Sequence, residues 1–368
     1  MTEKLNVAIA GAGLISYFHR RGATLAGANI RGVLASSAER SAAAAAQYGL
    51  PKGYASFDDL LADDVDVVHI ASPNDSHAPF ALGALAAGKH VICEKPLGRS
   101  VAEARQMADA AAAAGKVGAV PFVYRFHPMV REVRERVLDG RLGQLALIHG
   151  SYLQDWMLPR ETANWRVDPA AGGASRAFAD IGSHWIDLIE WVTGVQFVEA
   201  VGATSILFGE RPTRGGGSAP VVTEDSATLL LRTGSGMLAN VVVSQVAAGR
   251  KNRLWFEIDG SEGSAVFDQQ SPDQLWLGGH ESNTDFLRGA TAGGAEMERL
   301  SKMPAGHSQG YADAFDAFIA DTYAMVRGEA SAAQVAGVAT FEDGARAVSV
   351  TQALLDSVAT GGWASIGD

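Results

Sequence analysis

Asp180 and His184 stand four residues apart, where a helix is expected from about 183 to 193. An imidazole can accept a proton near neutral pH, and a carboxylate one helical turn away can fix its tautomer. The pair therefore has the composition of a general base with its orienting acid, although a carboxylate complementing a helix dipole beside a structural histidine gives the same pattern. Asp187 would add a third metal ligand, but the spacing is generic and no fourth ligand stands out, so no metal is expected.

Lys95 lies between Glu94 and Pro96, directly after the apolar run at 90–93. Charged side chains at the end of a buried strand are rarely left without partners, and a Lys–Pro bond offers a low-energy route to a cis peptide that can orient a side chain. Ion pairing with Glu94 is the alternative, which the opposite directions of neighbouring strand side chains disfavour. We therefore expect Lys95 to point toward a ligand. Cys93, the one cysteine, is expected in the core rather than as a nucleophile.

The segment 11–15 (Gly-Ala-Gly-Leu-Ile) follows a short apolar strand and opens a helix. A tight glycine turn at this place lets backbone N–H groups approach a pyrophosphate at the helix N-terminus. Ser16 replaces the third glycine of the strict fingerprint, so a plain strand–turn–helix connection is the alternative. The position at the first strand–helix turn favours a dinucleotide.

The second expected strand ends without the acidic residue that would hold a ribose 2′-hydroxyl. Ser36, Ser37 and Arg40 stand there instead and can receive the 2′-phosphate of NADP. The same residues can equally cap the next helix. The choice between NAD and NADP therefore stays open.

Ser72, Pro73, Asn74 and His77 follow the expected strand 65–71, at the edge where open α/β sheets place their ligands. An ordinary turn with a helix cap explains these residue types as well.

Up to about residue 120, the elements that must position these residues are strands and helices in alternation. Short β-type runs are separated by Ala-rich helical stretches, which is typical of a parallel sheet with crossover helices. The expected strands are 6–10, 31–35, 65–71, 90–93 and 117–120. The poly-Ala tracts at 42–46 and 110–114 are expected to be crossover helices, because Ala is the best helix former.

After about residue 125 the pattern changes. A helix near 128–138, a strand near 144–153 and the helix at 183–193 precede four runs separated by Gly-rich turns, which predict an antiparallel sheet. These runs are 226–232, 236–245, 253–258 and 264–267, and helices near 307–327 and 340–358 follow. The segment 210–220 is a candidate mobile loop, and 279–306 is polar and Gly-rich enough to cover a cleft or to be disordered.

The composition limits the kinds of partner that the chain can bind. The chain of 368 residues is 47% hydrophobic and carries a formal net charge of −11 with no Lys/Arg-rich run, which argues against nucleic acid or an anionic membrane surface. No uncharged apolar stretch reaches the roughly 18 residues of a membrane span, and the N-terminus lacks the features of a secretory signal. A lone cysteine cannot form an internal disulfide, so the cytoplasm is the expected location.

Together these segments resemble the Gfo/Idh/MocA oxidoreductase family, the group around glucose–fructose oxidoreductase and inositol dehydrogenase, along nearly the whole chain. The most specific parts are Glu94-Lys95-Pro96 and the Asp-x-Gly-x-His stretch at 180–184. The resemblance implies an α/β protein with an N-terminal Rossmann domain, a doubly wound parallel sheet, at 1–124. It also implies a substrate-binding and oligomerisation α/β domain at 125–368 with a large open, mostly antiparallel sheet, whose C-terminal helices can pack back on the first domain. A homodimer or homotetramer formed through that sheet is expected.

The resemblance further implies hydride transfer between the nicotinamide C4 of NAD or NADP and a secondary hydroxyl or ketone of a sugar, cyclic polyol or sugar derivative. His184 would be the base, Asp180 its orienter and Lys95 the group that stabilises alkoxide charge, and no metal is required. Cofactor contacts are expected from Gly11, Gly13, Leu14, Ile15, Ser36, Ser37, Arg40, Ser72, Pro73, Asn74, His77, Glu94, Lys95, Arg125, Trp165 and Arg166. Substrate contacts are expected from Lys95, Tyr124, Tyr152, Asp155, Asp180, His184, His307 and Tyr311.

Two alternatives keep the same fold. Some relatives hydrolyse glycosides by transient oxidation with a tightly bound NAD, and others are nucleotide-binding regulatory proteins that have lost the catalytic groups. The presence of Lys95, Asp180 and His184 argues against the regulatory alternative. The identity of the sugar or polyol and the direction of the reaction are not readable from these residues.

Overall fold

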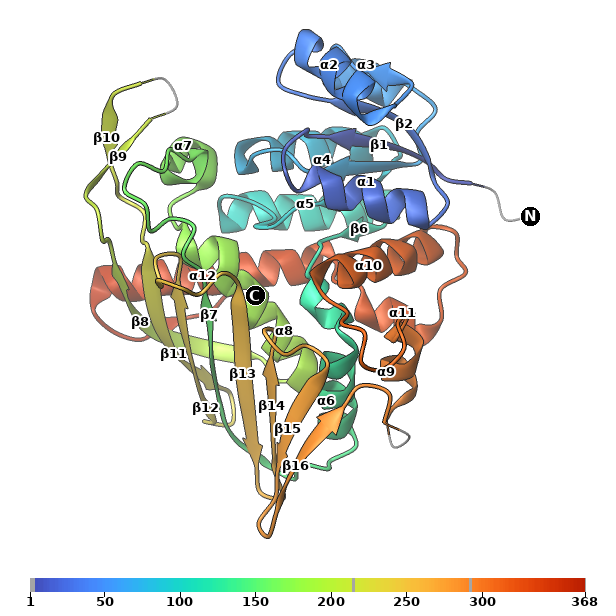
Figure 1. Ribbon diagram of the computed structural model, residues 1–368. Coiled ribbons are helices and arrows are strands. Elements are labelled where there is room, and N and C mark those ends of the chain that lie inside the picture. Colours follow the sequence, from blue (N-terminus) through green and yellow to red (C-terminus); the bar gives the residue numbers. More distant parts are fainter. Residues whose placement is uncertain (1–3, 214–215, 291–292, 368) are drawn as a thin grey trace. The chain divides into compact units, whose positions relative to one another are not determined.

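The computed structural model describes residues 4–213, 216–290 and 293–367 (Figure 1). The chain divides into two compact units, Met1–Val123 with Tyr311–Ala345, and Tyr124–Gly310 with Arg346–Asp368. The first unit is therefore built from two segments that are far apart in the sequence.

The first unit contains a six-stranded parallel sheet in the order β3-β2-β1-β4-β5-β6. Its strands are β1 (Asn6–Ala10), β2 (Asn29–Leu34), β3 (Lys52–Gly53), β4 (Val67–Ile70), β5 (His90–Cys93) and β6 (Gly118–Ala119). All four residues of β4 are buried, as expected for a parallel strand covered on both faces. The strand order reverses between β1 and β4, which is where doubly wound sheets bind their ligands. The parallel sheet and the five expected strands are confirmed, with bounds shifted by up to two residues, and β3 is additional.

The helices of the first unit include both poly-Ala tracts, and all but the last two connect its strands. They are α1 (Ser16–Leu25), α2 (Ala38–Tyr48), α3 (Phe57–Ala62), α4 (His77–Ala86), α5 (Val101–Ala114), α10 (Tyr311–Val326) and α11 (Ala332–Gly337). The crossover helices predicted from the poly-Ala tracts are confirmed as α2 and α5. Helix α10 packs closely on α1, since a Cβ added at Gly22 would lie 2.8 Å from Cγ1 of Ile319.

The second unit contains a nine-stranded sheet in the order β16-β15-β14-β13-β7-β12-β11-β8-β17. Its strands are β7 (Leu145–Leu153), β8 (Phe197–Ser205), β11 (Ser226–Thr233), β12 (Leu238–Ser244), β13 (Arg253–Gly260), β14 (Ser264–Asp268), β15 (Gln274–Gly278), β16 (Asn283–Leu287) and β17 (Ala364–Ser365). Hairpins join β11 to β12 and β13 to β14 as predicted.

One part of the predicted antiparallel sheet is wrong. Strands β12 and β13 are not neighbours, because β7 lies between them, parallel to β12 and antiparallel to β13. The connection over 245–252 is long enough to pass two strand spacings, about 10 Å. Turn residues identify a reversal of the chain but not which distant strand enters beside it, so the sequence pattern did not reveal this arrangement.

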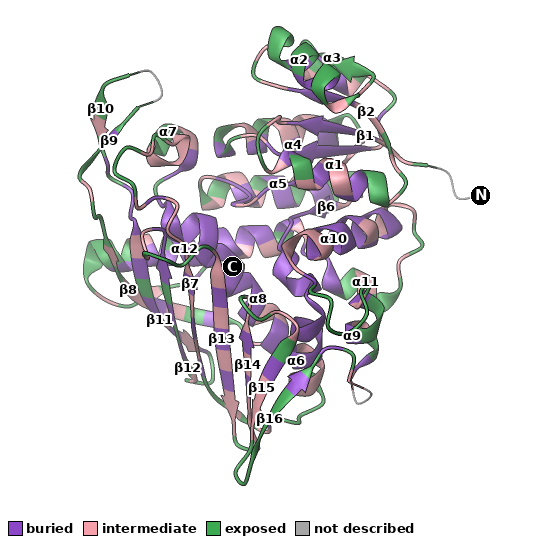
Figure 2. Ribbon diagram, viewed as in Figure 1, coloured by how far each residue is buried: buried purple, intermediate pink, exposed green. Residues whose placement is uncertain are grey.

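Helices cover one face of the nine-stranded sheet. This unit contains α6 (Pro128–Leu138), α7 (Pro169–Gly172), α8 (Ser183–Thr193), α9 (Ala295–Leu300) and most of α12 (Phe341–Thr360). Figure 1 shows α6 and α8 beside the sheet, and Trp185 of α8 donates from Nε1 to the carbonyl of Trp255 at 3.1 Å. Burial alternates along β11 and along most of β12 and β13 (Figure 2). The expected helices at 128–138 and 183–193 are confirmed at those bounds.

The two segments expected to be mobile or disordered contain regular structure. Strands β9 (Glu210–Pro212) and β10 (Ser218–Pro220) pair antiparallel within 210–220, and β16 and α9 lie within 279–306. Arg288 anchors the second segment, since it pairs with Asp273 and donates to the carbonyls of Met303 and His307, each at 2.6 Å. Disorder is therefore the wrong alternative for these described parts, and a role of 279–306 in covering a cleft stays a prediction. Residues 214–215 and 291–292 lie outside the described residues. Within the described ranges, no helix has the length and apolar character needed to cross a membrane.

Candidate active site

The first glycine turn joins β1 to α1 and leaves space beside it. Gly11 has φ of 125°, and a Cβ there would lie 2.3 Å from the carbonyl oxygen of Ala71, so packing against the end of β4 requires glycine. At Gly13, by contrast, an added Cβ would meet no heavy atom within 4 Å. Leu14 is exposed, and the first turn of α1 has no side-chain cap. An open glycine position at an uncapped helix start fits the close approach of a dinucleotide pyrophosphate.

Ser37 caps α2, as its Oγ accepts the backbone N–H of Arg40 at 3.3 Å. The capping interpretation is thus confirmed for Ser37. Arg40 donates from Nη1 to Oγ of Ser36 at 3.0 Å, and both side chains are exposed. Their interaction with a 2′-phosphate stays a prediction.

His77 links the ends of β4 and β5. It is buried, with Nδ1 2.9 Å from the carbonyl oxygen of Pro96 and Nε2 3.0 Å from that of Ser72. Burial lowers the pKa of His77, which favours a neutral ring that donates to one of these carbonyls. Asn74 is also buried and begins a short 3₁₀ turn, Asn74–Ser76.

The segment around Lys95 follows β5, and the Lys95–Pro96 peptide is cis, as the sequence predicted. The carboxylate of Glu94 is buried; Oε2 accepts the Lys95 backbone N–H at 3.2 Å, and Oε1 lies 3.1 Å from Nε2 of His19. Cys93 is buried, and burial raises the pKa of its thiol well above the usual range, which agrees with the predicted core role.

In the second unit, Asp180 lies in a π-helical turn, Phe178–Gly182, that continues directly into α8. Both Asp180 and His184 are buried, on one continuous helical segment. Oδ2 of Asp180 accepts from Nε2 of Gln245 at 2.8 Å, and Oδ1 lies 3.6 Å from Nε of Arg166. The orientation of His184 by Asp180 stays a prediction.

Two tyrosines surround His184. The ring of Tyr124 meets the imidazole edge-on at 5.1 Å, and the ring of Tyr152 lies 6.2 Å away. The tyrosine hydroxyls are 2.5 Å apart. Burial raises the pKa of Tyr124 to about 12, so its hydroxyl stays protonated at neutral pH.

A chain of polar side chains extends from these hydroxyls. Asn252 accepts from Tyr152 at 2.8 Å and donates to Tyr124 at 3.2 Å. Gln154 donates to Asn252 at 2.7 Å and accepts from Trp156 Nε1 at 2.6 Å. Sequence reasoning missed Gln154 and Asn252, and it also missed Gln245. Gln154 lies two residues after Tyr152, so strand alternation offered a signal for it alone.

The other predicted site residues of this unit have described partners. Arg125 forms a buried two-point ion pair with Asp187, at 2.9 and 2.5 Å, so Asp187 is engaged by an arginine. Arg166 stacks 4.5 Å over the ring of Trp165. Asp155 pairs with Lys251 at 2.7 Å, and this hydrogen bond lowers the pKa of Asp155.

Two further predicted residues lie elsewhere. His307 is exposed in the second unit, whereas Tyr311 belongs to the first unit, where it packs edge-on against Phe18 at 5.1 Å. Contacts of these residues with a cofactor or substrate stay predictions.

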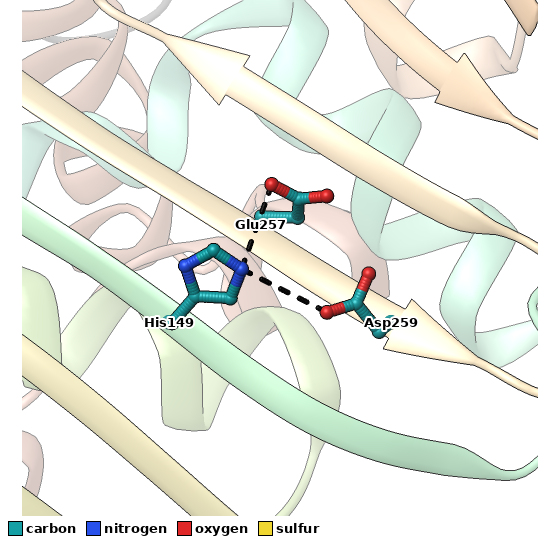
Figure 3. Close-up of side chains that lie close together, drawn as sticks. All are labelled: His149, Glu257 and Asp259. Carbon is teal, nitrogen blue, oxygen red and sulfur yellow. Dashed lines mark ion pairs between the residues drawn. The ribbon is translucent and has the colours of Figure 1, made fainter.

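Three potential metal ligands gather elsewhere on the sheet. Nε2 of His149 in β7 lies 3.5 Å from Glu257 and 3.8 Å from Asp259, both in β13 (Figure 3). His149 and Glu257 are directly opposite in the strand register, and Asp259 is on the same face two residues further on. Cross-strand ion pairing accounts for this cluster.

Comparison with known proteins identifies related chains. Residues 5–122 match the oxidoreductase family with an NAD-binding Rossmann fold, and residues 130–266 match the GFO/IDH/MocA C-terminal domain. The chain is 34% identical to levoglucosan dehydrogenase of Pseudarthrobacter phenanthrenivorans over 67% of each chain. It is 30% identical to inositol 2-dehydrogenase 2 of Saccharopolyspora erythraea over 98% of this chain and 95% of the relative.

Solved structures of related dehydrogenases have the same fold as this chain. A levoglucosan dehydrogenase in complex with NADH and levoglucosan aligns with a TM-score of 0.89 at 28% identity, covering 99% of this chain and 100% of the other. An inositol dehydrogenase homolog from Azotobacter vinelandii, complexed with NAD⁺, aligns with a TM-score of 0.89 at 25% identity, covering 99% and 98%. The two family matches cover most of the chain, and the conserved architecture extends across both units. The chain therefore belongs to the Gfo/Idh/MocA family of oxidoreductases, with an NAD-binding Rossmann fold in its N-terminal part.

Proposed function

We propose that this protein is an NAD(P)-dependent dehydrogenase that oxidises a secondary hydroxyl of a sugar, anhydro-sugar or cyclic polyol. The observation that carries the proposal is the presence of Lys95, Asp180 and His184 in a chain that is 34% identical to levoglucosan dehydrogenase. The burial of Asp180 and His184 beside a protonated tyrosine supports it.

The residues of the first unit that are proposed to hold the cofactor lie at or just beyond the carboxyl ends of the parallel strands. The open space at Gly13 and the uncapped start of α1 suit the pyrophosphate. Ser72 and Asn74, at the end of β4, would contact the rest of the dinucleotide. When bound, the nicotinamide supplies a hydride acceptor at C4.

His184 is proposed as the base that takes the hydroxyl proton while the alcohol carbon loses a hydride and becomes a carbonyl. The carboxylate of Asp180, four residues earlier on the same helical segment, would stabilise the imidazolium that forms. The ammonium of Lys95 would stabilise negative charge on the reacting oxygen.

The polar chain in the second unit supports this substrate class. Gln154 and Asn252 carry amide donors and acceptors, and Trp156 adds a half-buried aromatic ring. Hydroxyl-bearing rings present polar edges and apolar CH faces, which such a set can bind. We therefore propose levoglucosan and inositols as the first compounds to test, because two relatives are named as dehydrogenases of these compounds.

The test mixes purified protein with NAD⁺ or NADP⁺ and a panel of anhydro-sugars, inositols, aldoses and glycosides. The absorbance of reduced nicotinamide and the mass of the products are followed. Reduced cofactor that accumulates with one alcohol, and does not with a Lys95→Ala control, supports the proposal. Cleavage of a glycoside without net reduced cofactor would replace it with redox-assisted hydrolysis. Cofactor binding without turnover across the panel would count against a dehydrogenase of this substrate class.

We also propose that copies of the chain associate through the helix-free face of the nine-stranded sheet. Leu147, Leu238 and Val242 are 39%, 38% and 45% exposed there, on neighbouring strands. A dimer or tetramer would bury these apolar side chains. Light scattering should give a mass of two or four chains, which Val242→Asp reduces; a monomeric wild-type protein would refute this proposal.

A further inference from the structure

A buried chain of polar side chains crosses the first unit, and of its four members only Glu94 was given a role above. Its members are Tyr323 of α10, His69 of β4, His19 of α1 and Glu94 after β5, and it is called the buried histidine chain below. The two histidines and Tyr323 are 0% exposed, and Glu94 is 6% exposed. Three elements and the residue after β5 thus contribute one buried polar side chain each.

The contacts run in sequence from Tyr323 to Glu94. The Tyr323 hydroxyl lies 2.8 Å from Nε2 of His69, Nδ1 of His69 lies 2.9 Å from Nδ1 of His19, and Nε2 of His19 lies 3.1 Å from Oε1 of Glu94. Each distance is that of a hydrogen bond. Both ring nitrogens of each histidine are therefore engaged.

One set of donor and acceptor roles satisfies every group of the chain. With the carboxylate of Glu94 as acceptor, His19 donates from Nε2 and accepts at Nδ1. His69 must then donate from Nδ1 and accept at Nε2 from the Tyr323 hydroxyl. In this arrangement every N–H and O–H of the chain has an acceptor. Burial lowers the pKa of His69 well below its ordinary value and raises that of Tyr323 well above its own, which agrees with a neutral imidazole and a protonated phenol.

The chain ends on the backbone of Lys95. Oε1 of Glu94 faces His19, and Oε2 accepts the Lys95 N–H. On the other side of Lys95, His77 contacts the carbonyl oxygen of Pro96. The peptide that carries Lys95 is thus held by buried groups before and after it.

We propose that His19 and His69 are positioning residues that orient Glu94 and, through it, the Lys95 backbone. This inference rests on the proposed function for its catalytic consequence, because only a reacting Lys95 makes its orientation matter to turnover. Small displacements of a catalytic group are costly, of the order of a hundredfold in rate for about 1 Å. The chain supplies the rigidity that prevents such displacement.

The test compares His19→Leu with His19→Gln. Glutamine can place an amide donor where Nε2 stands, whereas leucine fills the space and donates nothing, leaving Glu94 without its partner. In protein labelled with ¹⁵N-lysine, hydrogen exchange at the Lys95 amide should accelerate about tenfold or more in His19→Leu and stay near the wild-type rate in His19→Gln. The kcat should fall about tenfold to a hundredfold in His19→Leu, with the Kd for NADH within about twofold, and recover in His19→Gln.

Tyr323→Phe is the second variant, for the case in which His19→Leu does not fold. It removes one oxygen and leaves Nε2 of His69 without its donor, so Lys95 amide exchange should rise by a smaller factor. Unchanged exchange in a folded His19→Leu and in Tyr323→Phe, or equal effects of leucine and glutamine at position 19, would overturn the inference. The exchange measurement needs no turnover, so it gives this answer even if the protein oxidises none of the proposed substrates.

Discussion

Gly11 and Gly13 stand two residues apart in one turn, yet the structure gives them opposite sensitivities to the same substitution. An alanine Cβ at position 11 would lie 2.3 Å from the carbonyl oxygen of Ala71 and would hold a φ of 125°. An alanine Cβ at position 13 would meet no heavy atom within 4 Å and is not at a positive φ. Gly11→Ala should therefore damage the fold, whereas Gly13→Ala should leave it intact.

The changes in stability and in cofactor affinity can be estimated from the surroundings of each glycine. A non-glycine residue in such a conformation costs about 1–3 kcal/mol, and relieving the clash with the end of β4 adds to this, so a loss of about 3 kcal/mol is expected for Gly11→Ala. That corresponds to a drop in Tm of about 6–12 °C for a unit of this size. Gly13→Ala should change stability by less than about 0.5 kcal/mol. Its methyl group would occupy space proposed for the pyrophosphate, which should cost about 1–3 kcal/mol of binding, or at least about fivefold in Kd.

The assay pairs thermal unfolding with a fluorescence titration of NADH for each variant. The expected result is a loss of stability in Gly11→Ala and a stable Gly13→Ala that binds NADH weakly. If Gly13→Ala bound NADH with wild-type affinity, the proposed position of the pyrophosphate at this turn would be wrong. A Gly11→Ala variant as stable as the wild type would show that the approach of the turn to Ala71 is not close.

Three further outcomes are expected. Lys95→Ala should lower turnover by several orders of magnitude with little change in Tm, and near-normal turnover would remove Lys95 from the mechanism. Alcohol oxidation should rise with pH as the imidazole of His184 loses its proton and becomes able to act as a base, and His184→Ala should abolish this neutral-pH dependence; an unchanged pH–rate profile would reject His184 as the base. If Ser36 and Arg40 hold a 2′-phosphate, Arg40→Ala should weaken the binding of NADPH more than the binding of NADH. Equal weakening of both affinities in isothermal titration calorimetry would refute that role.

The elements that carry the proposed catalytic residues were predictable from local patterns. The strand at 90–93 before Lys95 and the helix at 183–193 after Asp180 agree with β5 and α8 residue for residue. Both predictions used signals from neighbouring residues only. The strand has a continuous apolar run bounded by charge and glycine, and the helix has apolar residues at helical spacing. The π-helical turn that contains Asp180 had no such signal, because its residues have the same pattern as the first turn of an α-helix.

The side-chain networks were not predictable, because they depend on strand register. Gln245 follows β12 and Asn252 precedes β13, and they reach the region of β7 only because β7 pairs with both strands. The contact of His19 could not be predicted either. In the sequence this residue stands between aromatic and arginine residues of an amphipathic helix, and nothing local shows that it faces His69. A buried polar residue is recognised only once its distant partner is known.

The two networks should differ in their tolerance of substitution, and this bears on how substrate preference can change in such a protein. The buried histidine chain is closed to solvent, so removal of one member leaves an unpaired polar group at a cost of about 1–3 kcal/mol. Gln154, Trp156 and Asn252 are only partly buried, so water can replace a lost partner. Changes in hydroxyl recognition can therefore accumulate at Gln154 and Asn252 without loss of the fold. The orientation of Lys95, by contrast, depends on a chain whose members are all buried, so water cannot replace a lost partner there.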